Sequence, residues 1–319
     1  MTQFFMITNR DLTDEGLGSD RAELSYFTSD GDDLGNFGNW TNVTFDRFKK
    51  LIIGAANSFP LITDPGRQEE QKHLTIFIHG YNNSWSDATR IYRSLHDHLY
   101  ANSTGLGVIV LFNWPSLGAP TGYLADREHA RACADDFADV LSNVYDWLLI
   151  KQKDAVEDEK KACRAKISII AHSMGNYVLQ EAMYVAWVRK NKPLLVSLVN
   201  QLLMVAADVD NDLFKTGETV GDSNGEGIAN LTYRVSALFS PRDPVLGISA
   251  GLKHFGKRRL GRSGLDGDFP IPDNVWDLNC TDLFLPDTPS TQVHSAYFAS
   301  PKILDKMRLI LQGIDRTLT

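Results

Sequence analysis

Apolar residues along this 319-residue chain fall into short continuous runs separated by longer stretches with helical spacing. Continuous apolar runs of this kind are typical of parallel strands that are covered on both faces. The runs that we assign to the main strands are His73–Ile78, Gly107–Phe112, Ile167–Ile170, Leu202–Ala206 and Tyr233–Phe239.

Stretches in which apolar residues recur every three or four positions predict helices between these strands. They are Thr44–Phe59, Ala88–Leu99, Asp126–Lys151, Asn176–Trp187 and Pro301–Gly313. Strands that alternate with helices over the whole chain predict one doubly wound α/β domain, residues 1–319, with a mostly parallel sheet and helices on both of its faces.

The remaining segments are shorter or richer in glycine and charge. Residues 1–70 form an N-terminal wing on the domain, in which the strands Phe4–Thr8 and Ala22–Ser29 precede the first helix. We interpret Asp64–Gln71 as a loop, Thr216–Gly227 as a mobile loop and Val275–Leu278 as a short strand. Residues 247–274 form a basic, Gly-rich loop.

The segment Lys166–Leu179 places a serine at a sharp turn between a strand and a helix. The turn, residues 171–175, reads AHSMG, which matches the nucleophile-elbow motif G-x-S-x-G apart from Ala171 at its first position. Residues at both ends of the motif must be small so that strand and helix can approach each other. Ser173 therefore becomes the candidate nucleophile, at a helix N-terminus that favours developing negative charge. An ordinary strand-to-helix turn is the alternative.

The strand His73–Ile78 ends in a second turn with possible chemistry, His79-Gly80-Tyr81. Gly80 borders the expected pocket and lets the backbone turn, so that the N–H of Tyr81 can point at a substrate carbonyl oxygen. With the N–H of Met174, it would form an oxyanion hole. A simple strand-ending turn is the alternative, and we expect His79 to bond loop backbone rather than act as a base.

Trp114 follows the strand Gly107–Phe112 at the same edge of the sheet. It is a candidate wall of the pocket, although packing would explain it equally well.

A serine hydroxyl needs a base to attack a carbonyl, and the base needs an orienting carboxylate. His254 and His294 are the only histidines after Ser173, and the base follows the nucleophile in chains with this motif. We choose His294, because a loop after the last predicted strand can return over Ser173. His254 lies among cations that disfavour its charged form.

Asp208, Asp210 and Asp243 each follow a predicted strand and are candidates for the orienting acid. Counting strands from the elbow favours Asp243, which follows the second strand after it. Asp208 lies one strand earlier and remains the alternative, and it is also a candidate pocket residue.

Composition and charge narrow the classes of function. The net charge of −8, from 32 basic and 40 acidic residues, argues against a nucleic-acid partner. Cys133, Cys163 and Cys280 lie far apart without CxxC spacing, which argues against a disulfide framework or a zinc site. The N-terminal apolar run is too short for a signal peptide, and no apolar stretch reaches the roughly 18 residues of a membrane span. We therefore expect a cytoplasmic protein without a transmembrane segment, metal or organic cofactor.

Six sequence blocks, taken in order, resemble the α/β-hydrolase superfamily. They are HGYNNS (79–84), NWPS (113–116), AHSMGN (171–176), AADVD (206–210), SPRD (240–243) and VHSAYF (293–298). Their combination is similar to a largely bacterial branch of α/β-hydrolases of unknown function, over about Phe4 to His294. The resemblance implies the α/β-hydrolase fold and a serine hydrolase site of Ser173, Asp243 and His294. Val293 stands where that branch usually has glycine, and the resemblance implies no substrate.

Together, the residues and the resemblance predict a serine-dependent carboxyl-ester hydrolase: an esterase, a lipase-like enzyme or a thioesterase that acts on a small acyl ester through an acyl-enzyme. Two other functions stay open at this stage. One is acyl transfer by the same triad, and the other is a non-catalytic α/β-hydrolase that binds a ligand or a protein.

The basic part of the Gly-rich loop, residues 253–262, carries five Lys/Arg residues and one histidine in an acidic chain. One interpretation is that it borders the pocket mouth and attracts an anionic substrate group or an acidic membrane surface. The other is a solvated lid whose charges keep the loop soluble.

Overall fold

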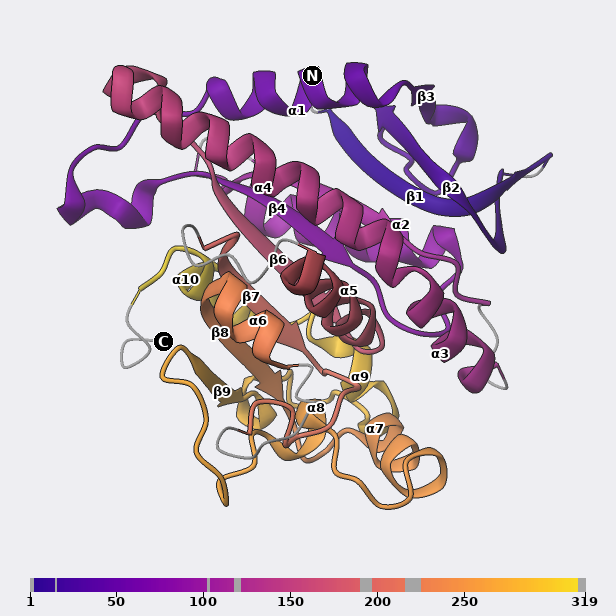
Figure 1. Ribbon diagram of the computed structural model, residues 1–319. Helices are drawn as coiled ribbons and strands as arrows, with labels where there is room; N and C mark the ends of the chain where they lie inside the picture. The colour runs from indigo at the N-terminus through magenta and orange to yellow at the C-terminus, as the bar shows by residue number, and fades with distance from the viewer. Residues whose placement is uncertain are drawn as a thin grey trace.

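The predicted strands lie side by side in one nine-stranded sheet (Figure 1). The computed structural model describes residues 3–14, 16–101, 104–117, 122–189, 197–215 and 225–314. The strands are β1 (Phe4–Thr13), β2 (Gly16–Ser29), β3 (Thr41–Val43), β4 (His73–Ile78), β5 (Gly107–Asn113), β6 (Lys166–His172), β7 (Val199–Val205), β8 (Thr232–Phe239) and β9 (Val275–Asn279). Their spatial order is β3-β2-β1-β5-β4-β6-β7-β8-β9. Only β2 pairs antiparallel with its neighbours, which confirms the mostly parallel sheet.

The direction in which the chain adds strands reverses at β4. From β4 the chain moves to β5 on one side, then crosses to β6 on the other side and continues outward through β7, β8 and β9. When the loops after two neighbouring parallel strands run in opposite directions, a crevice forms between the two loops at the carboxyl ends of the strands. The loops after β4 and β6 carry Gly80 and Ser173, so the topology itself brings these two turns together.

Helices cover both faces of the sheet, as predicted. One face packs against α1 (Phe45–Asn57), α3 (Tyr123–Ala132), α4 (Ala134–Glu157), α5 (Gly175–Arg189), α6 (Gly225–Leu231) and α8 (Leu260–Ser263). The other face packs against α2 (Trp85–Leu95), α7 (Pro244–Ile248), α9 (Val293–Ala296) and α10 (Pro301–Leu311). In Figure 1, α4 and α5 lie in front of the sheet and α10 lies behind it. None of the helices in the described ranges is both long and apolar enough to cross a bilayer.

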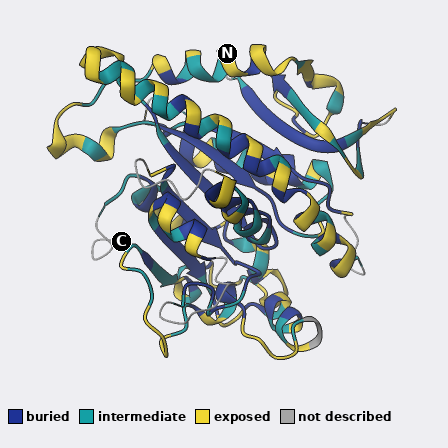
Figure 2. Cartoon of the chain, viewed as in Figure 1, coloured by how far each residue is buried: buried dark blue, intermediate teal, exposed yellow. Residues whose placement is uncertain are grey.

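Side chains of successive residues on the central strands pack into the two hydrophobic cores on opposite faces of the sheet. On β4, Ile76 and Ile78 pack toward α4 and α5, whereas Phe77 packs toward α2 and α10. On β6, Ile169 and Ile170 divide in the same way. Figure 2 shows these strands buried and the outer faces of the helices exposed. Burial on both faces is the physical reason why the strands read as continuous apolar runs.

Residues of the N-terminal segment continue the same sheet. β1 pairs parallel with β5, with Phe5 opposite Val110, and β2 folds back antiparallel beside it. Helix α1 follows, and Thr44 caps it by accepting the N–H of Arg47 (3.3 Å). Because Phe4 and Phe5 contribute to the two different cores, this segment shares the domain's packing on both faces.

The helix predicted over Asp126–Lys151 is wrong in one respect: it is two helices, α3 and α4, which meet at Cys133. The N–H of Cys133 still bonds the carbonyl of His129, and its own carbonyl still accepts the N–H of Phe137. The helical hydrogen bonds thus continue through the junction, and the apolar periodicity along the sequence gives no sign of it.

The Gly-rich stretch Thr216–Gly227 also differs from its interpretation as a loop. Residues 216–224 lie outside the described residues, but Gly225 and Gly227 open helix α6. A Cβ on Gly225 would lie 2.3 Å from the carbonyl oxygen of Leu213, and one on Gly227 would lie 2.9 Å from that of Met183. These glycines allow close packing rather than a flexible loop. Similarly, the predicted loop Asp64–Gln71 contains 3-10 turns over Pro65–Glu70.

Three buried histidines make the stability of this fold sensitive to pH. Burial lowers the pKa values of His73, His79 and His172 to about 3, and the charges of Lys166 and Lys72 act in the same direction on His73. In the unfolded chain a histidine titrates near a pKa of about 6.5. Between these values the unfolded chain binds protons that the folded chain does not, so this stability is complete above about pH 6.5 and is lost as the pH falls.

Replacing His73 with leucine should therefore flatten the pH dependence of stability. One histidine that binds a proton only in the unfolded chain adds about 1.4 kcal/mol per pH unit to the slope of the unfolding free energy against pH. Below pH 6 the His73→Leu variant should lack that contribution. Urea unfolding over a pH series measures that slope. An unchanged slope in His73→Leu would contradict the burial argument.

Candidate active site

Ser173 occupies the tip of the turn between β6 and α5 in a left-handed backbone conformation, with φ of 53°. Non-glycine residues in this region cost on the order of 1–3 kcal/mol and persist where their surroundings hold them. Here the N–H of Ser173 donates to the carbonyl of Val205 (3.0 Å), and its carbonyl accepts the N–H of Asp208 (3.1 Å). The side-chain amide of Asn176 donates to the carbonyl of Ala171 (2.9 Å). The loop after β7 and the first turn of α5 therefore hold the elbow.

The elbow and the loop after β4 approach each other so closely that glycine is needed on both. A Cβ on Gly175 would lie 2.4 Å from the carbonyl oxygen of His79. A Cβ on Gly80 would lie 2.7 Å from the Cβ of Ser173. Ala171 stands inside the sheet opposite Ile78, where its methyl group is fully buried. The methyl group at the first motif position is thus accommodated by the core.

The structure brings Ser173, His294 and Asp243 together. Nε2 of His294 lies 2.8 Å from Oγ of Ser173, and Nδ1 of His294 lies 2.7 Å from Oδ2 of Asp243. A carboxylate only accepts hydrogen bonds, so Nδ1 carries the proton and Nε2 offers its lone pair to the serine hydroxyl. This is the arrangement that lets a histidine take the serine proton.

Asp243 is fully buried and is held by a second role at the start of α7. Its Oδ1 accepts the N–H of Leu246 (3.1 Å), which makes Asp243 the N-cap of that helix. Because the cap holds Oδ1 in place, Oδ2 points toward His294.

His294 lies in the short helix α9 rather than in the loop that we expected. Val293 is fully buried in the core with α2 and α10 and anchors this helix. Apolar periodicity does not reveal a helix of one turn, which is why the sequence suggested a loop.

His172 is a residue of the site that the sequence analysis missed. Its Nε2 lies 2.9 Å from the carbonyl oxygen of His294, and a carbonyl can only accept, so Nε2 carries the proton. Burial, followed by the nearby His294, lowers the pKa of His172 to about 3 and keeps it neutral. The residue before Ser173 thus holds the backbone of His294. Its position in the motif was visible, but its partner, 122 residues away, was not.

The loop after β4 rests on His79 and Trp114. The ring nitrogens of His79 lie 2.9 Å from the carbonyl oxygen of Gly80 and 3.1 Å from that of Trp114, which confirms that His79 bonds backbone. The indole N–H of Trp114 donates to the carbonyl of His79 (2.8 Å), and the two rings stack at 5.3 Å. Trp114 is fully buried, so it supports the loop rather than walling a pocket. The oxyanion role of the Tyr81 and Met174 N–H groups stays a prediction.

A cavity of about 640 Å³ opens beside His294. Its lining comes from the loop after β4, from α2 and from the segment before and within α9, and it includes Tyr81, His172 and Arg90. This volume is within the range of small-molecule sites. Its wall mixes apolar side chains such as Ile91 and Phe298 with polar ones such as Asn82, Asp287 and Gln292.

Asp208, the alternative acid and pocket candidate, is occupied elsewhere. Its buried carboxylate accepts hydrogen bonds from Tyr123 Oη (2.7 Å), Ser249 Oγ (2.8 Å) and Arg259 Nε (2.9 Å). Burial alone raises the pKa of Asp208, but the Arg259 charge and the two hydroxyl donors lower it overall. Of the two candidate acids, the structure therefore brings Asp243, and not Asp208, to His294.

The basic loop differs from both interpretations of residues 253–262. Arg259 is fully buried and pairs with Asp208 and with Asp210, and Lys257 also bonds Asp210 (3.1 Å). Arg262 donates to the carbonyl of Asp243. Arg259 and Arg262 thus fit neither a solvated lid nor a substrate-binding loop, because carboxylates after β7 and a carbonyl after β8 hold them inward, whereas the side chain of Lys257 stays 63% exposed. The side chain of Lys253 lies outside the described residues, and Arg258 is exposed.

His254, the alternative base, belongs to the same cluster as Asp208. Its Nε2 lies 2.6 Å from Oη of Tyr123. Burial and the charges of Arg259 and Arg127 lower the pKa of His254 to about 4. Neither His254 nor any other described residue of 253–262 lines the cavity beside His294.

One protein family and several solved structures are similar to this chain. The model of a family described as "Alpha/beta hydrolase of unknown function (DUF900)" matches residues 61–304. No curated protein matches. Similar solved structures include an esterase of Pyrobaculum calidifontis, with 12% identity, a TM-score of 0.35 and coverage of 83% of this chain and 89% of that one. An esterase of Rhizomucor miehei has 10% identity and a TM-score of 0.39 over 100% and 85%. EstE1, a carboxylesterase from a metagenomic library, has 16% identity and a TM-score of 0.34 over 77% and 82%.

Gly80→Ala should destabilise the protein, because its Cβ has no room beside Ser173. Overpacking of this kind costs roughly 1–3 kcal/mol of unfolding free energy. Gly54→Ala is the matched control: nothing lies within 4 Å of its Cβ position in α1, and alanine in a helix interior gains about 0.5–1 kcal/mol. Urea unfolding measures both, and a Gly80→Ala protein as stable as wild type would contradict the close approach.

Proposed function

The chain belongs to the α/β-hydrolase family of unknown function whose model matches residues 61–304, and we propose that it is a serine hydrolase of carboxyl esters. The observation that carries this proposal is the hydrogen-bonded series from Asp243 through His294 to Ser173, with distances of 2.7 and 2.8 Å. The strained elbow, with φ of 53° at Ser173, supports it, because strain of this kind clusters at reactive sites.

In the proposed reaction, Ser173 Oγ attacks the acyl carbon while His294 Nε2 takes its proton. Asp243 holds Nδ1–H and stabilises the imidazolium. The same proton then passes to the leaving alcohol or thiol as the carbon–oxygen or carbon–sulfur bond breaks, which leaves an acyl-enzyme on Ser173. Water, activated by His294, hydrolyses that acyl-enzyme and restores the serine.

Charge develops on the substrate oxygen during both steps. We assign its stabilisation to the backbone N–H groups of Tyr81, which follows Gly80, and Met174, which follows the nucleophile. Removal of one such donor typically costs about 3 kcal/mol of transition-state stabilisation. The cavity beside His294 would hold the remainder of a small ester.

Ser173→Ala should abolish both hydrolysis of p-nitrophenyl esters and covalent labelling by a fluorophosphonate. Ser295→Ala is the matched control, because Ser295 lines the same cavity next to His294 and bonds only the carbonyl of Gln292 in the described structure. It should keep near wild-type activity. A wild-type protein that is labelled but transfers its acyl group only to an added alcohol is an acyltransferase. One that is neither labelled nor active is a binding protein, and the proposal fails.

Substitution of Asp243 should mainly lower kcat, whereas substitution of Asp208 should mainly lower the unfolding free energy. Asp243→Asn keeps the cap of α7 but removes the orienting charge, so kcat should fall by about 10⁴-fold with little loss of stability. Asp208→Asn weakens the pairing of buried Arg259, which should cost roughly 3 kcal/mol of unfolding free energy and affect kcat much less. Ester kinetics and urea unfolding of both variants test this, and the reverse ranking of kcat would assign the acid to Asp208.

A further inference from the structure

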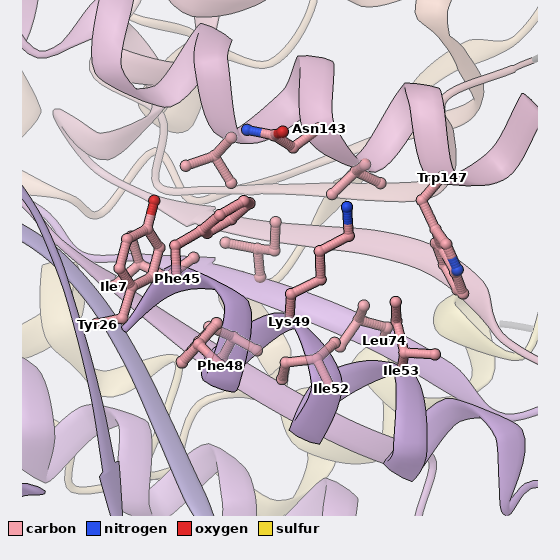
Figure 3. A pocket seen from close by; sticks show the side chains of 14 residues that line it. Ile7, Tyr26, Phe45, Phe48, Lys49, Ile52, Ile53, Leu74, Asn143 and Trp147 are labelled. Carbon is pink, nitrogen blue, oxygen red and sulfur yellow. The ribbon is translucent and has the colours of Figure 1, made fainter. Parts of the chain in front are cut away.

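A second cavity lies away from the triad, between α1 and α4 on the face of the sheet shown in Figure 3. Ile7 and Val110, from β1 and β5, form part of its floor. Ile52 of α1 and Asn143 of α4 stand on opposite sides of it. The cavity shares none of its described lining residues with the cavity beside His294.

Its volume of about 90 Å³ is large for a packing defect. A water molecule needs roughly 10–15 Å³ on this scale, together with two to four polar partners. Apart from Lys49 and Asn143, the lining residues are aliphatic or aromatic, so water is a poor occupant. The volume matches about six to nine water-sized groups, which is the size of a short hydrocarbon chain with a small polar head.

One positive charge stands at the mouth of this cavity. The side chain of Lys49 extends from α1 into the space between the helices, and its ammonium lies 5.8 Å from the centre of the Phe45 ring (Figure 3). Among the described residues Lys49 forms no ion pair. Asn143 of α4 is on the rim, and its amide nitrogen donates to the carbonyl of Asp139 (2.9 Å). The cavity therefore combines an apolar floor with a single cation.

We propose that this cavity binds a small amphiphilic carboxylate of about the size of hexanoate. The hydrocarbon chain covers Ile7, Val110 and their neighbours, and the carboxylate pairs with Lys49 Nζ. Charge complementarity selects an anion over a neutral apolar molecule, and the volume excludes a long acyl chain. The inference does not depend on the proposed hydrolase activity, because it uses different residues on a different part of the sheet.

Calorimetric titration with hexanoate tests the site directly. The protein should bind one hexanoate saturably, and more tightly than acetate, which lacks the chain, or hexan-1-ol, which lacks the charge. Lys49→Gln should weaken hexanoate binding about fivefold, the effect of one largely exposed ion pair, and leave hexan-1-ol binding unchanged. Lys50→Gln is the matched control, since this exposed neighbour on α1 does not line the cavity, and it should bind as wild type.

A second variant tests the apolar part. Val144→Trp places a larger side chain in the cavity and should abolish hexanoate binding, while urea unfolding verifies that the variant folds. No saturable binding of hexanoate, or binding that neither Lys49→Gln nor Val144→Trp changes, would overturn the proposal. Ser173→Ala should bind hexanoate as wild type does, and loss of binding in that variant would place the carboxylate at the triad instead.

Discussion

The geometry of the candidate site depends on how closely the turn after β4 approaches the turn after β6. These strands are direct neighbours, with Ile78 opposite Ala171, so the turns that follow them leave the sheet side by side. Gly175 makes room for the carbonyl of His79, and Gly80 makes room for Ser173 itself. Any side chain larger than hydrogen at either position would separate the nucleophile from the backbone N–H groups that follow Gly80. This contact therefore determines what else can meet at Ser173.

The other two groups of the series reach Ser173 through short helices from distant parts of the chain. Asp243 is held by the cap that it forms on α7, and His294 is held by α9, whose Val293 is anchored in the core. His172 connects these parts, because its ring bonds the carbonyl of His294 while its neighbour Ser173 bonds the His294 ring. The elbow thus positions His294 as well as Ser173.

Buried charge organises the adjoining region. Arg259 is fully enclosed and is stabilised by the carboxylates of Asp208 and Asp210, and Asp208 also binds Tyr123. Tyr123 in turn packs edge-on against Tyr81 in the loop after β4. A cluster that looked like a surface patch in the sequence is therefore part of the support beneath the site. The guanidinium of Arg259 can be buried because its carboxylate partners lie beside it. A buried guanidinium without partners would be strongly destabilising.

The sequence by itself determined the local features of this protein. Continuous apolar runs specified the central strands, because a strand buried on both faces has no polar side, and the AHSMG turn specified the elbow, because only small residues permit it. The order of strands and the HS block also pointed to Asp243 and His294. Tertiary structure alone decided the rest. The helix at Gly225, the role of His172 and the burial of Arg259 each depend on a partner far away in the chain, and no periodicity or composition records such a partner.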